Sequence, residues 1–89
     1  MITGKTIVLT GCNSGIGLEV LKLILKGDNR ILCVDKNVDV LKSYESDSLH
    51  ILQKDVSSKE AVDEVFEVAE EKLGHIDIFF ANAGYAYYE

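Results

Sequence analysis

The feature that most constrains this chain is the glycine-rich stretch TGCNSGIG at residues 10–17, which follows the apolar run 7–9. Such a stretch points to ligand binding only where it follows a strand and opens a helix within one βαβ unit. The run 6–10 predicts a strand that is buried on both faces. Apolar residues then recur at helical spacing, at Ile16, Val20, Leu23 and Ile24, and the predicted helix ends near Gly27. The glycines therefore fall at a predicted strand-to-helix turn.

The rest of the chain continues to alternate between the two patterns. Strands are predicted at 30–35, 49–52 and 76–81, with a weakly patterned helical piece at 38–44. A longer helix is predicted from Ser57, which forms a capping box with Glu60, to the closing glycine, Gly74. The apolar stripe of this helix comprises Val62, Val65, Phe66, Ala69 and Leu73.

Strands separated by helices imply right-handed crossovers and a parallel sheet. The predicted fold is α/β, a three-layer Rossmann-type arrangement with strand order 3-2-1-4, which is half of a doubly wound domain. With 89 residues, the chain has room for one domain, spanning residues 1–89.

Composition and charge exclude several classes of function. A formal charge of −6 disfavours binding to nucleic acid. The apolar runs are too short to cross a membrane, and no helix is rich in Lys and Arg on one face. The amino-terminal residues do not have the form of a signal peptide, so a cytoplasmic protein is expected.

Cysteine and histidine usage adds little chemistry. Cys12 and Cys33 are expected to be free thiols, as is usual inside cells. Cys33 is predicted in the core, whereas Cys12 is either a small loop residue or a thiol activated by the helix that follows. His50 and His75 have no companions at metal-ligand spacing, so no metal site is predicted.

The three glycines have separate roles in a phosphate-binding turn. Gly11 allows a tight exit from the strand, Gly15 lets backbone approach a pyrophosphate, and Gly17 lets the helix pack closely on the sheet. Backbone N–H groups of the first helical turn, helped by the helix dipole, then face the phosphate. Asn13 and Ser14 can add side-chain hydrogen bonds. The alternative is that the glycines only form a flexible turn.

Two acidic residues follow the second and third predicted strands. Asp35 stands where a dinucleotide fold places an acid for the ribose hydroxyls, and it would repel a 2′-phosphate, so NAD is favoured. Lys36 leaves NADP open, because a cation there can meet that phosphate. Asp55 can accept from an adenine amino group while Val56 packs on the ring, or Asp55 can instead cap the next helix.

The fourth predicted strand ends at Asn82, Ala83 and Gly84, small residues that let backbone lie beside a cofactor ribose or form a plain turn. All four of these loops lie at the carboxyl ends of strands, where open α/β sheets bind ligands. The sequence therefore predicts one nucleotide site at that end of the sheet.

Together these residues resemble the short-chain dehydrogenase/reductase family. The resemblance rests on TGCNSGIG (the family's T-G-x-x-x-G-x-G), Asp35, the Asp55–Val56 pair and ANAG at 81–84, where Ala81 departs from the common N-N-A-G. It implies an NAD(P)-dependent oxidoreductase that moves a hydride between the cofactor and an alcohol or carbonyl substrate. It places Gly11, Asn13, Ser14, Gly15, Ile16 and Gly17 at the pyrophosphate. It places Asp35 at the adenosine ribose, Asp55 and Val56 at the adenine, and Asn82, Ala83 and Gly84 at the nicotinamide-side ribose.

The family's catalytic residues have no match here. Family catalysis uses a Ser and a Tyr-x-x-x-Lys pair, and Tyr85, Tyr87 and Tyr88 have no such Lys, so no catalytic residue is assigned. The expected protein is a truncated, amino-terminal cofactor-binding part of a reductase, inactive alone. The alternatives are a non-catalytic dinucleotide-binding or sensing module, and a similar sheet that binds a nucleotide sugar or flavin.

Resemblance to the family also implies that the fourth strand normally has a neighbour on its far side. Here that edge would expose backbone groups together with Ile78, Phe79 and Phe80. The chain is therefore expected to form a homo-oligomer, in which two copies pair through this edge or cover it by swapping.

Overall fold

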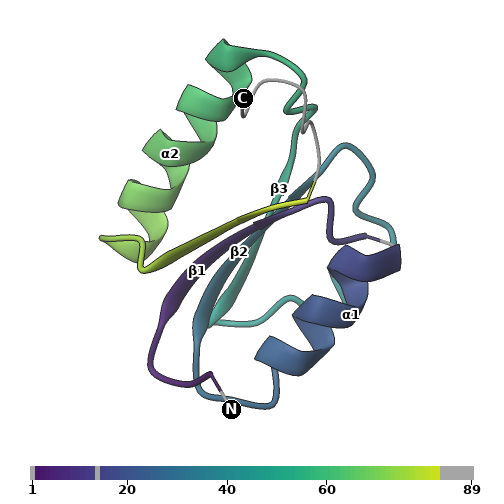
Figure 1. Ribbon diagram of the computed structural model, residues 1–89, viewed down its shortest axis with the longest axis vertical. Helices are drawn as coiled ribbons and strands as arrows, with labels where there is room; N and C mark the ends of the chain where they lie inside the picture. The colour runs from purple at the N-terminus through teal and green to yellow at the C-terminus, as the bar shows by residue number, and fades with distance from the viewer. Residues whose placement is uncertain (1, 14, 83–89) are drawn as a thin grey trace.

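The computed structural model describes residues 2–13 and 15–82 of the chain. Within these residues, four parallel strands form one sheet with the order β3-β2-β1-β4 and with helices on both faces (Figure 1). This order confirms the predicted Rossmann-type α/β arrangement. In chain order the elements are β1 (Thr6–Thr10), α1 (Gly15–Ile24), β2 (Arg30–Asp35), the 3₁₀ helix η1 (Leu41–Tyr44), β3 (Leu49–Gln53), α2 (Lys59–Leu73) and β4 (Ile78–Ala81).

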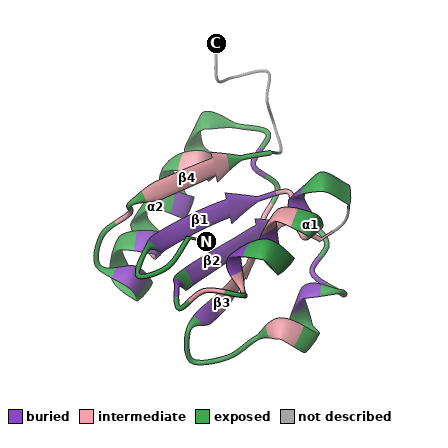
Figure 2. Ribbon diagram, turned by 60° about the horizontal axis from the view of Figure 1, so that its bottom comes forward, coloured by how far each residue is buried: buried purple, intermediate pink, exposed green. Residues whose placement is uncertain are grey.

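The core has two halves, one on each face of the sheet, because successive strand residues point to opposite faces. On one face, Ile7, Leu9, Ile31 and Cys33 pack with α1 and with Leu41 of η1. On the other face, Val8, Leu32 and Val34 pack against α2. The two central strands β1 and β2 are therefore buried, whereas β4 at the edge is only partly buried (Figure 2).

The predicted apolar face of α1 is wrong in part. Leu21 and Ile24 are buried, but Ile16 and Leu23, assigned to the buried stripe, are 72% and 61% exposed. The sequence GIGLEVLKLI is apolar on most sides of the helix, so spacing alone does not define which side meets the sheet. The helix also ends at Ile24, and the N–H of Gly27 donates to the Ile24 carbonyl at 3.1 Å in the turn that follows.

Three further boundaries differ from the sequence prediction. The N-cap of α2 is Ser58, not Ser57, because the Ser58 hydroxyl accepts the N–H of Ala61 at 3.2 Å. The helical piece predicted at 38–44 is reduced to η1, and β4 begins at Ile78 rather than at residue 76. The predicted stop of α2 at Gly74 is confirmed, with φ of 86° at that glycine.

A polar cluster joins β1 to the segment that leads into β4, at the amino end of the sheet. One carboxylate oxygen of Asp77 accepts both the backbone N–H and the hydroxyl of Thr6, each at 2.9 Å. His75 Nε2 lies 2.9 Å from the Thr6 hydroxyl and 3.3 Å from the same Asp77 oxygen. The hydrogen bonds from Thr6, backbone first, hold the pKa of Asp77 below its usual value.

We expect Asp77→Ala to lower the free energy of unfolding at neutral pH. Because the folded-state pKa lies below the ordinary value of 3.8, the ionised carboxylate stabilises the fold above pH 3.8. That stabilisation is lost as the pH falls through the lower folded-state pKa. Urea unfolding followed by circular dichroism should therefore show a gap between the two proteins that narrows on acidification. A gap of constant size from pH 7 to pH 2 would contradict this account of Asp77.

Candidate functional site

The glycine-rich turn lies at the carboxyl end of β1, as predicted. Gly11 has φ of 69°, and its N–H donates to the Val34 carbonyl of β2 at 2.9 Å, so the chain leaves β1 while still attached to its neighbour. Gly15 begins α1 with φ of 59°, and the space that a Cβ would take there is open. Ser14, predicted to contact phosphate, lies outside the described residues.

Gly17 brings α1 against the turn at one close contact. A Cβ on Gly17 would lie 1.9 Å from the Gly11 carbonyl oxygen, which is far inside van der Waals contact. Asn82, at the end of β4, donates from its side-chain Nδ2 to the same carbonyl at 3.0 Å. Its backbone N–H donates to the Thr10 hydroxyl at 3.1 Å. The ends of β1 and β4 and the start of α1 therefore meet at one place, as the close-packing role predicted for Gly17 requires.

Asp35 reaches the same turn from the end of β2. One of its carboxylate oxygens accepts the N–H of Asn13 at 3.0 Å, and the other accepts the N–H of Asn37 at 3.2 Å. The side chain is only partly buried. A carboxylate has about four lone-pair positions, so it can accept further hydrogen bonds from a ligand.

Asn13 has a second role that the sequence analysis did not predict. Its side-chain oxygen accepts the N–H groups of Val40 at 3.0 Å and Leu41 at 3.3 Å, just ahead of and at the start of η1. This contact fixes the connection between β2 and β3 to the glycine turn. No sequence pattern predicts this contact, because it depends on the conformation of residues 36–41.

The remaining predicted residues are more dispersed. Lys36 and Ile16 are exposed, the latter on the first turn of α1. Asp55 is exposed and accepts the N–H of Ser57 at 3.1 Å, a turn just ahead of the α2 N-cap. Val56 is 5% exposed and packs with the core on the α2 face. Ala83 and Gly84 lie outside the described residues.

The thiol of Cys12 is buried beneath the turn and takes part in the core on the α1 face. Its Sγ–H donates to the Leu9 carbonyl at 3.5 Å. The hydrogen bond with Cys12, together with burial, raises the pKa of the Cys33 thiol far above its usual value. The small-residue interpretation of Cys12 fits the structure, because a reactive thiol needs exposure and this side chain is fully buried.

Between residues 2 and 82, with residue 14 set aside, no three His, Cys, Asp or Glu side chains gather closely enough to hold a metal ion. In the same residues, neither helix has the length and apolar character needed to cross a membrane.

The fold and this turn define a Rossmann-type α/β protein, and comparison with known proteins gives the family. The family model described as short chain dehydrogenase matches residues 5–88. The chain therefore belongs to the short-chain dehydrogenase/reductase family, an oxidoreductase family.

Individual relatives agree with this membership. An uncharacterized oxidoreductase of Staphylococcus aureus (strain N315) is 32% identical over 88 residues, which cover 94% of this chain and 38% of that protein. The structure of 4-hydroxyisoleucine dehydrogenase complexed with NADH is 34% identical with a TM-score of 0.77, over 90% of this chain and 34% of that one. The 3-ketoacyl-(acyl-carrier-protein) reductase from Brucella melitensis complexed with NADH is 29% identical with a TM-score of 0.77, over 86% and 33%. The chain thus spans about a third of each relative's length.

We expect Gly17→Ala to destabilise the protein although alanine is the better helix former. In an unobstructed helix the change would stabilise by about 1 kcal/mol. The contact with the Gly11 carbonyl reverses the sign, and the net loss should be about 1–3 kcal/mol in denaturant unfolding. Glu19→Ala, at an exposed position of the same helix, should stay within about 0.5 kcal/mol of the unchanged chain. A stabilised Gly17→Ala protein would show that the close approach does not exist.

Proposed function

We propose that residues 1–89 are the NAD(P)-binding part of a short-chain dehydrogenase/reductase. The observation that carries this proposal is the glycine turn, held against the Asp35 carboxylate by the Asn13 N–H and against Asn82 by the Gly11 carbonyl. Two NADH-bound structural relatives support a nicotinamide dinucleotide as the ligand.

In this proposal the turn and the first residues of α1 hold the pyrophosphate. The first N–H groups of a helix have no partner within it, and the helix dipole favours negative charge there. The open space beside Gly15 fits a phosphate that approaches the backbone directly. The residues proposed for this role are Gly11, Asn13, Ser14, Gly15, Ile16 and Gly17.

Asp35 is proposed to accept hydrogen bonds from the adenosine ribose and to favour NAD over NADP. Its charge repels a 2′-phosphate, and two nearby N–H groups already have acceptors, since Asn37 donates to Asp35 and Val40 donates to Asn13. Lys36 is an exposed cation next to Asp35 and is the feature that keeps NADP as the second candidate.

The other two loops complete the proposed site. Asp55 is proposed to accept from the adenine amino group, although it also accepts the N–H of Ser57, as a turn residue would. The side chain of Val56 is buried in the core. We therefore propose that its backbone atoms, rather than its side chain, lie beside the adenine ring. Asn82, with Ala83 and Gly84, is proposed to lie at the nicotinamide-side ribose.

When bound, the cofactor supplies the hydride that such enzymes exchange with a small alcohol or carbonyl substrate. We propose this activity for the whole protein, in the cytoplasm, and binding without turnover for the 89 residues alone. No tyrosine in the chain is followed four residues later by lysine, and that pair is what the family resemblance requires for proton transfer. A non-catalytic dinucleotide-binding or sensing module is the second candidate, since the same glycine turn would serve binding without catalysis.

Titration of the chain with NADH, followed by cofactor fluorescence, should show saturable binding. The same protein mixed with NADH and a panel of aldehydes and ketones should oxidise no cofactor above background. Tighter binding of FMN than of either nicotinamide cofactor would overturn the cofactor assignment. NADH oxidation by the 89 residues would refute the separation of binding from catalysis.

We expect Asp35→Ala to weaken NADH binding by about 1.5–3 kcal/mol, roughly 10- to 150-fold, because hydrogen bonds to a charged acceptor are lost. NADPH binding should improve relative to NADH, since the repulsion of a 2′-phosphate is also removed. Asp39→Ala removes the same charge from an exposed position in the same connection and should leave the ratio of the two affinities unchanged. Equal effects of the two substitutions on that ratio would mean that Asp35 does not face the ribose.

A further inference from the structure

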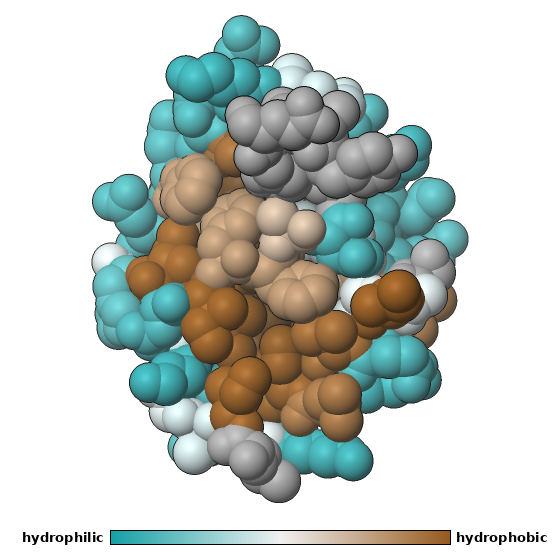
Figure 3. All heavy atoms as spheres, viewed as in Figure 1, coloured by the Kyte–Doolittle hydropathy of each residue, from teal (hydrophilic) through white to brown (hydrophobic). Residues whose placement is uncertain are grey.

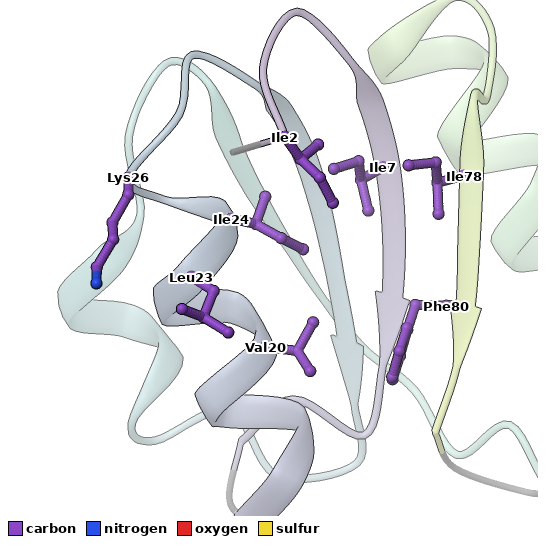
Figure 4. A pocket seen from close by; sticks show the side chains of 8 residues that line it. All are labelled: Ile2, Ile7, Val20, Leu23, Ile24, Lys26, Ile78 and Phe80. Carbon is purple, nitrogen blue, oxygen red and sulfur yellow. The ribbon is translucent and has the colours of Figure 1, made fainter.

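The apolar surface of the molecule is not where a cofactor phosphate is recognised. Figure 3 shows apolar side chains gathered over the middle of one side of the molecule, with hydrophilic side chains around them. A cavity of about 350 Å³ between α1, β1 and β4 is lined by apolar side chains apart from Lys26 (Figure 4). None of the residues proposed to hold the cofactor lines it. Discrimination between NAD and NADP, which differ by one 2′-phosphate, therefore has to come from polar groups at the carboxyl end of the sheet.

The connection between β2 and η1 carries those polar groups. Asp35 ends β2 and the exposed Lys36 follows it, and these are the two side chains whose charges bear on a 2′-phosphate. Further along, the buried side chains of Val38 and Leu41 attach the connection to the core on the α1 face. The connection is therefore fixed to the rest of the fold, and its conformation decides where the carboxylate and the cation lie relative to a bound ribose.

Asn13, in the glycine turn, bonds to this connection at two places. Its backbone N–H donates to one Asp35 carboxylate oxygen at 3.0 Å. Its side-chain oxygen accepts the N–H groups of Val40 at 3.0 Å and of Leu41 at 3.3 Å. The other Asp35 oxygen accepts the N–H of Asn37 at 3.2 Å. These bonds close a ring that runs from Asn13 through the carboxylate to Asn37, along the chain to Val40 and back.

The Asn13 side chain is the cap of η1, supplied from a different part of the chain. Val40, at the N-cap position of η1, makes no side-chain cap hydrogen bond of its own. Val40 and Leu41 offer N–H donors, so the oxygen of the Asn13 amide, and not its Nδ2, must face them. A side chain without an acceptor at residue 13 would leave both N–H groups without this partner and would loosen the start of η1.

We propose that Asn13 is the positioning residue that sets the preference for NAD over NADP, because it holds the Asp35 carboxylate and the connection behind it in one arrangement. The inference rests on the proposed function, since it assigns a role within the proposed cofactor site. A carboxylate already held in place meets the ribose hydroxyls without a further ordering cost, and it opposes a 2′-phosphate with its charge. When the ring of bonds is broken, Asp35 is free to turn away from a 2′-phosphate and Lys36 is free to approach it.

A direct contact between the Asn13 side chain and the pyrophosphate leads to a different expectation. NAD and NADP share the pyrophosphate, so the loss of such a contact weakens the binding of both cofactors by the same factor. The loss of the positioning role changes the ratio of the two affinities, because only one cofactor carries the 2′-phosphate. This ratio is therefore the quantity that separates the two roles of the side chain.

Fluorescence titration of Asn13→Ala with NADH and with NADPH measures the ratio. The preference for NADH should fall about 2- to 10-fold relative to the unchanged chain, the range expected for the loss of a hydrogen bond. An equal loss of affinity for both cofactors, or an unchanged preference, would overturn the positioning role and leave the proposed function standing. Binding of neither cofactor by the unchanged chain would refute the proposed function, and this inference with it.

Val40→Pro breaks the same ring at a residue proposed for no cofactor contact. Proline has no backbone N–H, and the φ of −70° at Val40 is one that proline adopts. This variant should lower the preference for NADH as Asn13→Ala does, whereas Val40→Ala, which keeps the N–H, should leave it unchanged. The effects of Asn13→Ala and Val40→Pro should not add in the double variant, because both remove the same bond. An unchanged preference in Val40→Pro, shown by circular dichroism to be folded, or full additivity would contradict the proposal.

Hydrogen exchange tests the ring of bonds without any cofactor. In Asn13→Ala, the amides of Val40 and Leu41 should exchange faster than in the unchanged chain. The amide of Ala61, which donates to Ser58 at the start of α2, should keep its rate. Acceleration at all three amides would mean that the substitution loosens the whole protein, and it would defeat the local role of Asn13. Unchanged rates at Val40 and Leu41 would show that Asn13 does not hold the connection, whether or not the chain binds NADH.

Discussion

The contact between Gly17 and the Gly11 carbonyl oxygen is the constraint on which the rest of the structure depends. Because Gly17 has no side chain, the first turn of α1 rests directly on the end of β1. Asn82 holds the same carbonyl from the end of β4. Three elements thus meet where the ligand site is proposed, and a single methyl group at Gly17 would separate them.

Much of the architecture is predictable because the sequence separates its apolar runs so clearly. Ile7 to Leu9 and Ile31 to Val34 are short, continuous and buried on both faces, and that is why the parallel sheet follows from the alternation of strands and helices. The strand order follows from the doubly wound arrangement that the glycine turn indicates. The face of α1 is not predictable in this way. Leu21 and Leu23 are equally apolar, and only the position of the sheet decides that one is buried and the other exposed.

Local chemistry leaves similar ambiguities at boundaries. Ser57 and Ser58 are both suitable N-cap residues. In the structure the Asp55 carboxylate accepts the N–H of Ser57, and the helix starts one residue later than the capping-box pattern predicts. The site shows the same limit. Its glycines and Asp35 are recognisable because they follow predicted strands. The contacts of Asn13 with Val40 and Leu41 are not predictable, because they join segments far apart in the sequence whose proximity no local sequence pattern indicates. The bonds between Thr6 and Asp77 are equally hidden in the sequence.

The burial of Cys12 directly under the glycine turn has a consequence for how the site can be observed. A maleimide reagent reaches this sulfur only when the turn lifts from β2, since none of the side chain is exposed in the closed arrangement. Alkylation at this position therefore reports transient opening of the loop. A molecule seated on the backbone amides above would slow that labelling, so an unmodified chain carries a built-in probe of occupancy.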